Sequence, residues 1–308
     1  MDNIKRVVIV HSPNSTRAKR YSSVVSYLAD IYRQDKLIDI ELTDVPYFQA
    51  IKQIVGKLRD GDLVVAAGGD GITQVTANAV YLAKLDTIFT TVPLGHGNDI
   101  SRAINKKNRN IEAILRQPVV DFYPLNVIIN KKISFAVMSY ITFGATTVIV
   151  DYLNKDNSRR LRRVLKNLTP AASVPIGNIG EISKKINELD FPDFWRDGKL
   201  LTDDSIGFFL IPAAHNVLRL PKDISLASSE FFFHYAKTKD KNLAKKIFMA
   251  GSWALRFPGE MTELEELRFT ENGANITVNI SGDNIKLGEV KTVSAVRSTR
   301  PIRILANK

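Results

Sequence analysis

The chain has 308 residues, 44% hydrophobic and 24% charged, which allows two globular domains and argues against widespread disorder. It contains no cysteine, which excludes disulfides and thiolate metal sites and is typical of a cytoplasmic protein. Its apolar runs are far shorter than the roughly 18–20 residues that span a bilayer, and its first residues lack the apolar core of a signal peptide.

The formal net charge of +11 indicates a negatively charged partner, such as a phosphorylated ligand or an anionic membrane surface. The basic clusters also fit solvated helix faces. No zinc-finger or RNA-recognition pattern accompanies them, so we do not expect nucleic acid as the partner. We expect a cytoplasmic protein, and the sequence leaves peripheral association with a membrane open.

Strand and helix patterns alternate over the first 120 residues. Apolar runs predict buried strands, and apolar residues at every third or fourth position predict helices between them. The expected strands are 6–12, 37–43, 62–69 and 87–95, and the expected helices are 18–34, 45–60, 72–85, one from about 98, and 111–117. This alternation predicts a parallel α/β sheet covered on both faces, in a domain that spans 1–120.

The pattern changes after about residue 117. A hairpin is expected to turn at 130–132, and short β runs separated by turn residues follow at 204–213, 225–236, 264–271, 274–282 and 290–298. Helical pieces are expected at 158–168, 180–188 and 242–255. The second half, 121–289, is therefore predicted to be mostly antiparallel β-structure, as a sandwich.

A glycine-rich turn follows the third predicted strand. Gly68, Gly69, Asp70 and Gly71 stand between "DLVVAA" and the helical "ITQVTANAV". Ligands of open α/β sheets bind beyond the carboxyl ends of the strands, where glycine lets backbone N–H groups approach phosphate oxygens. The alternative is a tight turn with a helix-capping aspartate.

A second glycine-rich turn follows the next strand, in "VPLGHGNDISRA". Gly95 and Gly97 flank His96, and Asn98 or Asp99 is placed to cap the following helix. His96 reads either as a phosphate donor or as an exposed loop histidine. Two such turns in consecutive βα units reach the same edge of the sheet, which predicts a cleft there.

The string "GGDG", followed about two dozen residues later by "PLGxGND", resembles the diacylglycerol kinase catalytic family of soluble lipid kinases, which is related to the NAD kinases. "SPNS" from Ser12 is similar to that family's Asn-Pro-x-Ser-Gly loop. The resemblance implies a Rossmann-like domain and a C-terminal β-sandwich, with 290–308 returning to the first domain. It further implies ATP and Mg²⁺ as cofactors and transfer of the γ-phosphate to a lipid hydroxyl.

The expected nucleotide-binding residues all lie in or beside these loops: Ser12, Gly68, Gly69, Asp70, Gly71, Gly95, His96, Gly97, Asn98 and Asp99. Asp70 is also a candidate catalytic residue, because it can hold a magnesium-bound water or orient the acceptor. The sequence assigns no direct metal ligands and leaves a homodimer open.

The chain departs from the family at several catalytic positions. Ile72 and Val75 stand where the family has threonine and glutamate, and the Asp-Gly-Glu motif that carries the family's general base is absent. The nearest strings are "SGD" at 281–283 and "LGE" at 287–289. If Ser281 takes the base position, Asp283 can substitute, since residues two apart on an extended strand share a face.

Two functions are therefore weighed. The first is a lipid kinase that acts on a substrate such as diacylglycerol at an anionic membrane, with Asp70 and Asp283 as catalytic residues. The second is a nucleotide-binding homologue with weak or lost kinase activity that serves as a binding or regulatory module. An NAD kinase shares "GGDG", but the full "PLGxGND" string favours the lipid-kinase branch.

Overall fold

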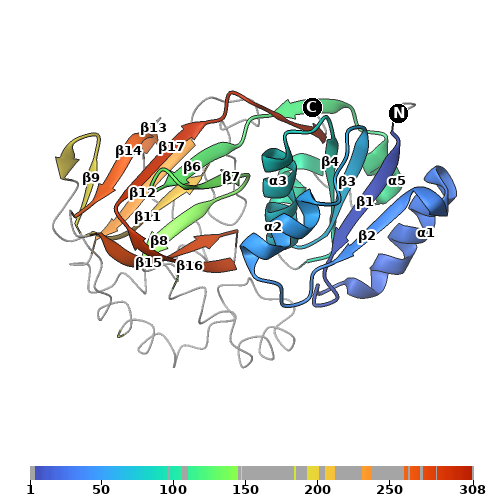
Figure 1. Ribbon diagram of the computed structural model, residues 1–308, viewed down its shortest axis with the longest axis horizontal. Coiled ribbons are helices and arrows are strands. Elements are labelled where there is room, and N and C mark those ends of the chain that lie inside the picture. The colour runs from blue at the N-terminus through green and yellow to red at the C-terminus, as the bar shows by residue number, and fades with distance from the viewer. Residues whose placement is uncertain are drawn as a thin grey trace.

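The structure is a computed structural model that describes residues 4–95, 98–105, 110–144, 147, 184, 193–200, 205–211, 231–237, 260–262, 264–270, 273–281 and 283–306. Within these residues an α/β half and a half built of β-sheets lie side by side (Figure 1). Apart from residue 184, the helices expected at 158–168, 180–188 and 242–255 lie outside the described residues. In the part of the chain that is described, no helix is long and apolar enough to cross a membrane.

The α/β half is built on one six-stranded sheet. Its order is β2 (Leu37–Glu41), β1 (Arg6–His11), β3 (Asp62–Gly68), β4 (Ile88–Pro93), β18 (Ile302–Leu305) and β5 (Val119–Phe122). Strands β2, β1, β3, β4 and β18 run parallel, whereas β5 pairs antiparallel with β18. The expected parallel α/β sheet is confirmed, with one antiparallel strand at its edge.

Helices cover both faces of this sheet, because its strands are apolar on both sides. Along β1, Val8 and Val10 contact one core, and Val7 and Ile9 contact the other. The first core includes residues of α2 (Tyr47–Val55), α3 (Asp70–Ala83) and α4 (Asp99–Asn105); the second includes residues of α1 (Tyr21–Tyr32) and α5 (Ile111–Leu115). Short 3₁₀ turns, η1 (Ala18–Arg20) and η2 (Gln34–Lys36), flank α1.

Helix α3 lies between the first sheet and the β half, so it is buried around most of its circumference (Figure 1). Its residues 73–80 are all buried, polar ones included. Thr73 and Thr76 donate their hydroxyls to the carbonyl oxygens of Gly69 and Ile72, which satisfies these side chains within the helix. The helix ends at Lys84, which adopts the left-handed conformation.

The β half consists of two antiparallel sheets. The first runs β10 (Lys199–Leu200), β9 (Phe194–Arg196), β14 (Leu264–Phe269), β17 (Thr292–Arg297), β6 (Leu125–Ile129) and β7 (Ile133–Val137). The second runs β13 (Glu260–Thr262), β12 (Phe231–Lys237), β11 (Ser205–Ile211), β8 (Ile141–Gly144), β15 (Ala274–Ile280) and β16 (Asp283–Val290). Both sheets bury apolar side chains in one shared core that includes Phe135 and Phe143, as expected for a sandwich.

The hairpin expected at 130–132 joins β6 to β7, and Asn130 and Lys131 take positive φ angles there. Within 290–308, β17 pairs in the β half, whereas β18 joins the first sheet. The division of the chain at residues 120 and 289 remains our proposal.

Candidate functional site

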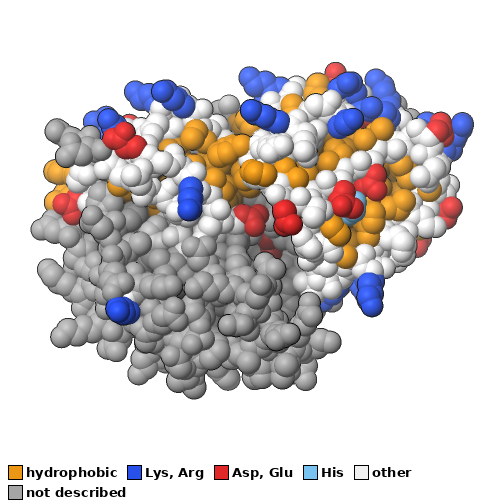
Figure 2. All heavy atoms as spheres, turned by 60° about the horizontal axis from the view of Figure 1, so that its bottom comes forward, with side chains coloured by type: hydrophobic (Ala, Val, Ile, Leu, Met, Phe, Trp, Pro, Cys, Tyr) orange, Lys and Arg blue, Asp and Glu red, His pale blue; other side chains and the backbone are white. Residues whose placement is uncertain are grey.

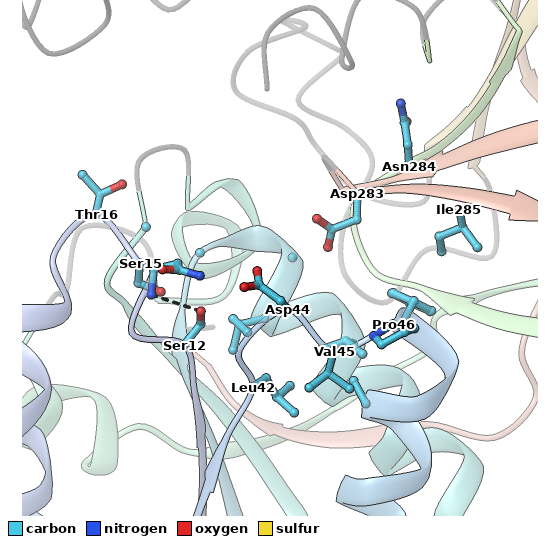
Figure 3. Close-up of a pocket in the computed structure, with 18 residues that line it drawn as sticks. Ser12, Ser15, Thr16, Leu42, Asp44, Val45, Pro46, Asp283, Asn284 and Ile285 are labelled. Carbon is cyan, nitrogen blue, oxygen red and sulfur yellow. Dashed lines mark hydrogen bonds between the residues drawn. The ribbon is translucent and has the colours of Figure 1, made fainter. Parts of the chain in front are cut away.

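A pocket of about 510 Å³ opens between the two halves, at the carboxyl ends of β1, β3 and β4. The α/β half supplies the loops after β1, β2, β3 and β4 and parts of α2 and α3, and the β half supplies the start of β16, from which the Asp283 carboxylate points into the pocket (Figure 3). The lining residues are Ser12, Asn14, Ser15, Thr16, Leu42, Asp44, Val45, Pro46, Tyr47, Ala50, Gly69, Gly71, Ile72, Val75, Gly95, Asp283, Asn284 and Ile285.

The two glycine-rich loops touch one another. A Cβ atom added to Gly95 would lie 2.3 Å from the Cα atom of Gly69, so only glycine fits at this contact. The N–H groups of Leu94 and Gly95 both donate to the carbonyl oxygen of Gly68. The structure therefore brings the two predicted phosphate loops together at one edge of the sheet.

Helix α3 begins directly at the first glycine loop. Gly69 is its N-cap residue, and the first N–H groups of an α-helix have no acceptor within the helix. These groups, with the positive end of the helix dipole, favour an anion at the pocket wall formed by Gly69 and Gly71. Asp70 accepts a hydrogen bond at 3.0 Å from the N–H of Ile100, so it also caps helix α4.

The second loop is closed by its own asparagine. The Asn98 Oδ1 accepts from the Gly95 N–H at 2.9 Å, and the Asn98 Nδ2 donates to the Gly95 carbonyl at 2.6 Å. Asn98 is buried and has a positive φ of 55°, a conformation that asparagine tolerates well. Its side chain therefore shapes the loop rather than lining the pocket.

Asp283 faces the first glycine loop from the opposite half. A Cβ atom on Gly71 would lie 2.5 Å from Oδ2 of Asp283, so the absence of a side chain at position 71 admits the carboxylate. Asp283 is exposed on its pocket side, yet the protein that encloses its other sides raises its pKa to about 6, with a further contribution from the charge of Asp70. The carboxylate is thus mostly ionised at neutral pH and can accept a proton.

Ser281 and Asp283 do not lie on one extended strand, contrary to the expectation above. Ile280 pairs with Asp283 across a two-residue hairpin turn, and Ser281 takes a φ of 50° within it. This turn buries Ser281 and leads Asp283 into the pocket.

Five of the predicted site residues line the pocket: Ser12, Gly69, Gly71, Gly95 and Asp283. Gly68, Asp70 and Asn98 lie directly beside it through the hydrogen bonds given above. Asp99 begins α4, although its side chain is not described, and His96 and Gly97 lie outside the described residues.

The two apolar departures from the family, Ile72 and Val75, both line the pocket. Ile72 packs against Gly68, where a Cβ atom would lie 2.6 Å from that of Ile72. Val75 is also part of the core that α2, α3 and α4 form with the first sheet. The wall that these side chains form with Leu42 and Val45 is apolar and offers a ligand no hydrogen-bond donor.

Tyr47, at the start of α2, lines the pocket and was not predicted from the sequence. Its hydroxyl accepts a hydrogen bond at 2.7 Å from Nδ2 of Asn78. Burial raises the pKa of Tyr47 above its ordinary value, so the phenol stays neutral. A tyrosine in the first turn of an amphipathic helix is too common a pattern to mark this position as part of a site.

Among the described residues that line the pocket, none is basic, whereas two are acidic: Asp44 and Asp283. A polyphosphate would therefore need a cation. Asp70 offers hard carboxylate oxygens beside the pocket, and Mg²⁺ is commonly held by one or two carboxylates together with phosphate oxygens and waters. The donor set fits that ion, although the described residues contain no group of three or more side chains able to ligate a metal.

Charge is distributed unevenly over the face seen in Figure 2. Lys and Arg side chains lie mostly around its upper rim, while acidic side chains occur near its middle. None of the described residues that line the pocket is Lys or Arg, so the basic side chains on this face lie outside that lining.

These observations define a class: a protein with a Rossmann-like parallel α/β half, an antiparallel β half, and a pocket between them that is lined in part by glycine-rich loops. Residues 6–121 match the family model of the diacylglycerol kinase catalytic domain, which confirms the resemblance seen in the sequence. No curated protein matches the chain.

Solved structures show the same fold over nearly the whole chain. A structure described as a diacylglycerol kinase from Bacillus anthracis str. Sterne aligns with a TM-score of 0.60 at 11% identity and covers 98% of this chain and 97% of its own. Two structures presented as proposed diacylglycerol kinases from the same organism align with TM-scores of 0.59 and 0.61 at 13% identity. They cover 98% and 99% of this chain and 97% and 99% of their own.

Proposed function

We propose that this protein is a lipid kinase that transfers the γ-phosphate of ATP to the hydroxyl of a lipid such as diacylglycerol. The observation that carries the proposal is the position of Asp283. Its carboxylate lies against Gly71, in the glycine-rich loop that leads into helix α3. A proton acceptor and an anion-binding helix terminus thus face the same pocket, which is the pairing that phosphoryl transfer requires.

In this proposal the amides of residues 69–71, packed against Gly95, bind the phosphates of ATP. A lipid hydroxyl enters from the side of the β half, and its oxygen bonds to the γ-phosphorus as the bond to the β–γ bridging oxygen breaks. Asp283 accepts the hydroxyl proton, and ADP leaves. Mg²⁺, held beside Asp70, would neutralise charge on the phosphates.

The apolar wall of the pocket supports a second candidate function. Ile72 and Val75 supply neither a hydroxyl nor a carboxylate to the nucleotide. A protein of this fold that binds nucleotide without turnover, as a regulatory module, would tolerate both side chains. Turnover separates the two proposals, since both require nucleotide binding.

The test is transfer of labelled phosphate from ATP–Mg²⁺ to lipid in vesicles that contain anionic phospholipid. The acceptors are diacylglycerol, sphingosine and a broader lipid panel, and the Asp283→Asn variant is the control. We expect a labelled lipid with wild-type protein and a strongly reduced amount with the variant. Stabilisation by ATP in a thermal-shift measurement without labelled lipid from any acceptor would favour the regulatory module, and no response to nucleotide would contradict both.

A further inference from the structure

Helix α3 takes the place of a missing neighbour strand along β7, the edge strand of its sheet. Gln74 Nε2 donates to the Ala136 carbonyl at 2.6 Å, and the Met138 N–H donates to Gln74 Oε1 at 3.0 Å. One turn later, Asn78 Oδ1 accepts from the Ala136 N–H at 2.8 Å. Two fully buried side chains thus satisfy backbone groups that an edge strand would leave unpaired.

Gln74 also reaches the turn that carries Asp283. The Ser281 hydroxyl lies 3.4 Å from Gln74 Oε1, a long hydrogen bond. The Ser281 N–H donates to the carbonyl oxygen of Tyr140. Tyr140 lies two residues after Met138, whose N–H donates to Gln74. The turn is therefore connected to Gln74 directly and through the segment 138–140.

At its other end, Gln74 is fixed to the glycine loop by the helix. It lies one turn after Asp70 on α3, so its position moves with the loop of residues 68–71. Gln74 thus links the loop in one half to Asp283 in the other through a short path of buried hydrogen bonds. Among the described residues, Asn78 bonds to Ala136 and Tyr47 and not to Ser281.

From this arrangement we propose that Gln74 is a positioning residue that holds Asp283 against the glycine loop across the boundary between the two halves. The kinetic consequence of this role rests on the proposed function, whereas the placement of Asp283 does not.

The central variant is Gln74→Met, which keeps side-chain length and removes the hydrogen bonds. Ser281→Ala removes the direct link alone and serves as the second variant in case Gln74→Met does not fold. The matched control is Arg300→Met. Arg300 packs its guanidinium 4.2 Å from the centre of the Tyr81 ring and bonds to the Tyr81 carbonyl, so it joins α3 to the segment before β18, away from Asp283.

The first readout is the titration of Asp283, followed by carboxyl-carbon NMR on ¹³C-aspartate-labelled full-length protein, with Asp283→Asn to assign the resonance. In wild-type protein the midpoint is expected at about 6. In Gln74→Met and Ser281→Ala we expect it to fall toward the ordinary aspartate value of about 3.9, because the carboxylate moves away from Asp70 and the enclosing walls. Arg300→Met is expected to leave it unchanged. An unchanged midpoint in both test variants would overturn the proposal.

The second readout is kinetic. We expect Gln74→Met to lower kcat roughly 10–100-fold, a part of the 10²–10⁴-fold that a general base contributes, with KM for ATP changed less than about three-fold. An equal loss of kcat in Gln74→Met and Arg300→Met would show a general effect of disturbing helix α3 instead and would contradict a specific role. If wild-type protein phosphorylates no acceptor, the proposed function fails, and the titration of Asp283 still decides the role of Gln74.

Discussion

Gly95 and Gly69 are in direct contact, close enough that no side chain fits at Gly95 without separating the two loops. We therefore expect Gly95→Ala to destabilise the protein by about 1–3 kcal/mol, the usual cost of overpacking. Nucleotide affinity is expected to fall roughly ten-fold or more, because separating the loops misaligns the site. A loss of about 1.4 kcal/mol in binding free energy corresponds to each factor of ten. Chemical denaturation and nucleotide titration measure the two effects.

The matched control for that variant is Gly56→Ala. Gly56 ends α2 with a φ of −63°, and an added Cβ would meet its nearest neighbour at 3.4 Å, an ordinary contact. Both properties should stay at wild-type values in this control. Wild-type nucleotide affinity in Gly95→Ala would show that contact between the loops is not needed for the site.

Replacing Asp283 by asparagine separates binding from transfer. The amide keeps the shape of the side chain but cannot accept the proton, so kcat should fall roughly 10²–10⁴-fold. Binding of ATP should persist, because the helix terminus and the loop of Gly95 are intact. Steady-state kinetics with a nucleotide titration provides the comparison, and an unchanged kcat would remove Asp283 from the reaction.

The raised pKa of Asp283 also predicts how stability depends on pH. Because its folded-state pKa of about 6 lies above the ordinary value, the fold favours the protonated acid and is destabilised as pH rises through this interval. Asp283→Asn should therefore have a higher Tm than wild-type protein at pH 8. The difference should shrink as pH falls and vanish below about pH 3, where the acid is protonated in folded and unfolded chains alike. A lower Tm of the variant at pH 8 would contradict the assigned pKa direction.

The same pKa predicts an acid limb in the rate. In kcat/KM the limb should have a midpoint near pH 6, because only the ionised carboxylate accepts the proton. A pH–rate profile between pH 5 and 8, with enzyme stability checked at each point, measures it. A flat profile across this range would exclude Asp283 as the general base.

Nucleotide binding is expected to depend on Mg²⁺. Acidic side chains line the described part of the pocket without a Lys or Arg beside them, so the charge of ATP is left to helix α3 and a metal ion. Replacing Mg²⁺ with a chelator should weaken ATP binding more than adenosine binding in calorimetric titrations. Equal affinities of ATP with and without the metal would contradict a metal site beside Asp70.

The strands of the first sheet could be predicted because burial on both faces leaves continuous apolar runs, as in β1 and β3. Strand β16 could not, since it lies at a sheet edge and most of its side chains are accessible, including Lys286 and Glu289. Its sequence therefore lacks the alternation that marks a strand. The hairpin turn at Ser281 was missed for the same reason.

The glycine loops could be predicted because their chemistry is local and their spacing follows from consecutive βα units. The roles of Gln74 and Asn78 could not, because their partners stand about sixty residues further along the chain. A weaker signal existed. Asp70, Gln74 and Asn78 recur every four residues and put polar groups on one face of a helix that is otherwise largely apolar.

Strand β18, the last of the described strands, lies between β4 and β5 and fills an interior position in the first sheet. Until it emerges from the ribosome, Phe89 and Phe122 have no strand between them to bury their edge of the core. The nascent α/β half must therefore wait for the whole β half before it can close. A fragment that ends at residue 120 would lack the strand that pairs with β4, so assembly of the cleft requires the synthesis of β18.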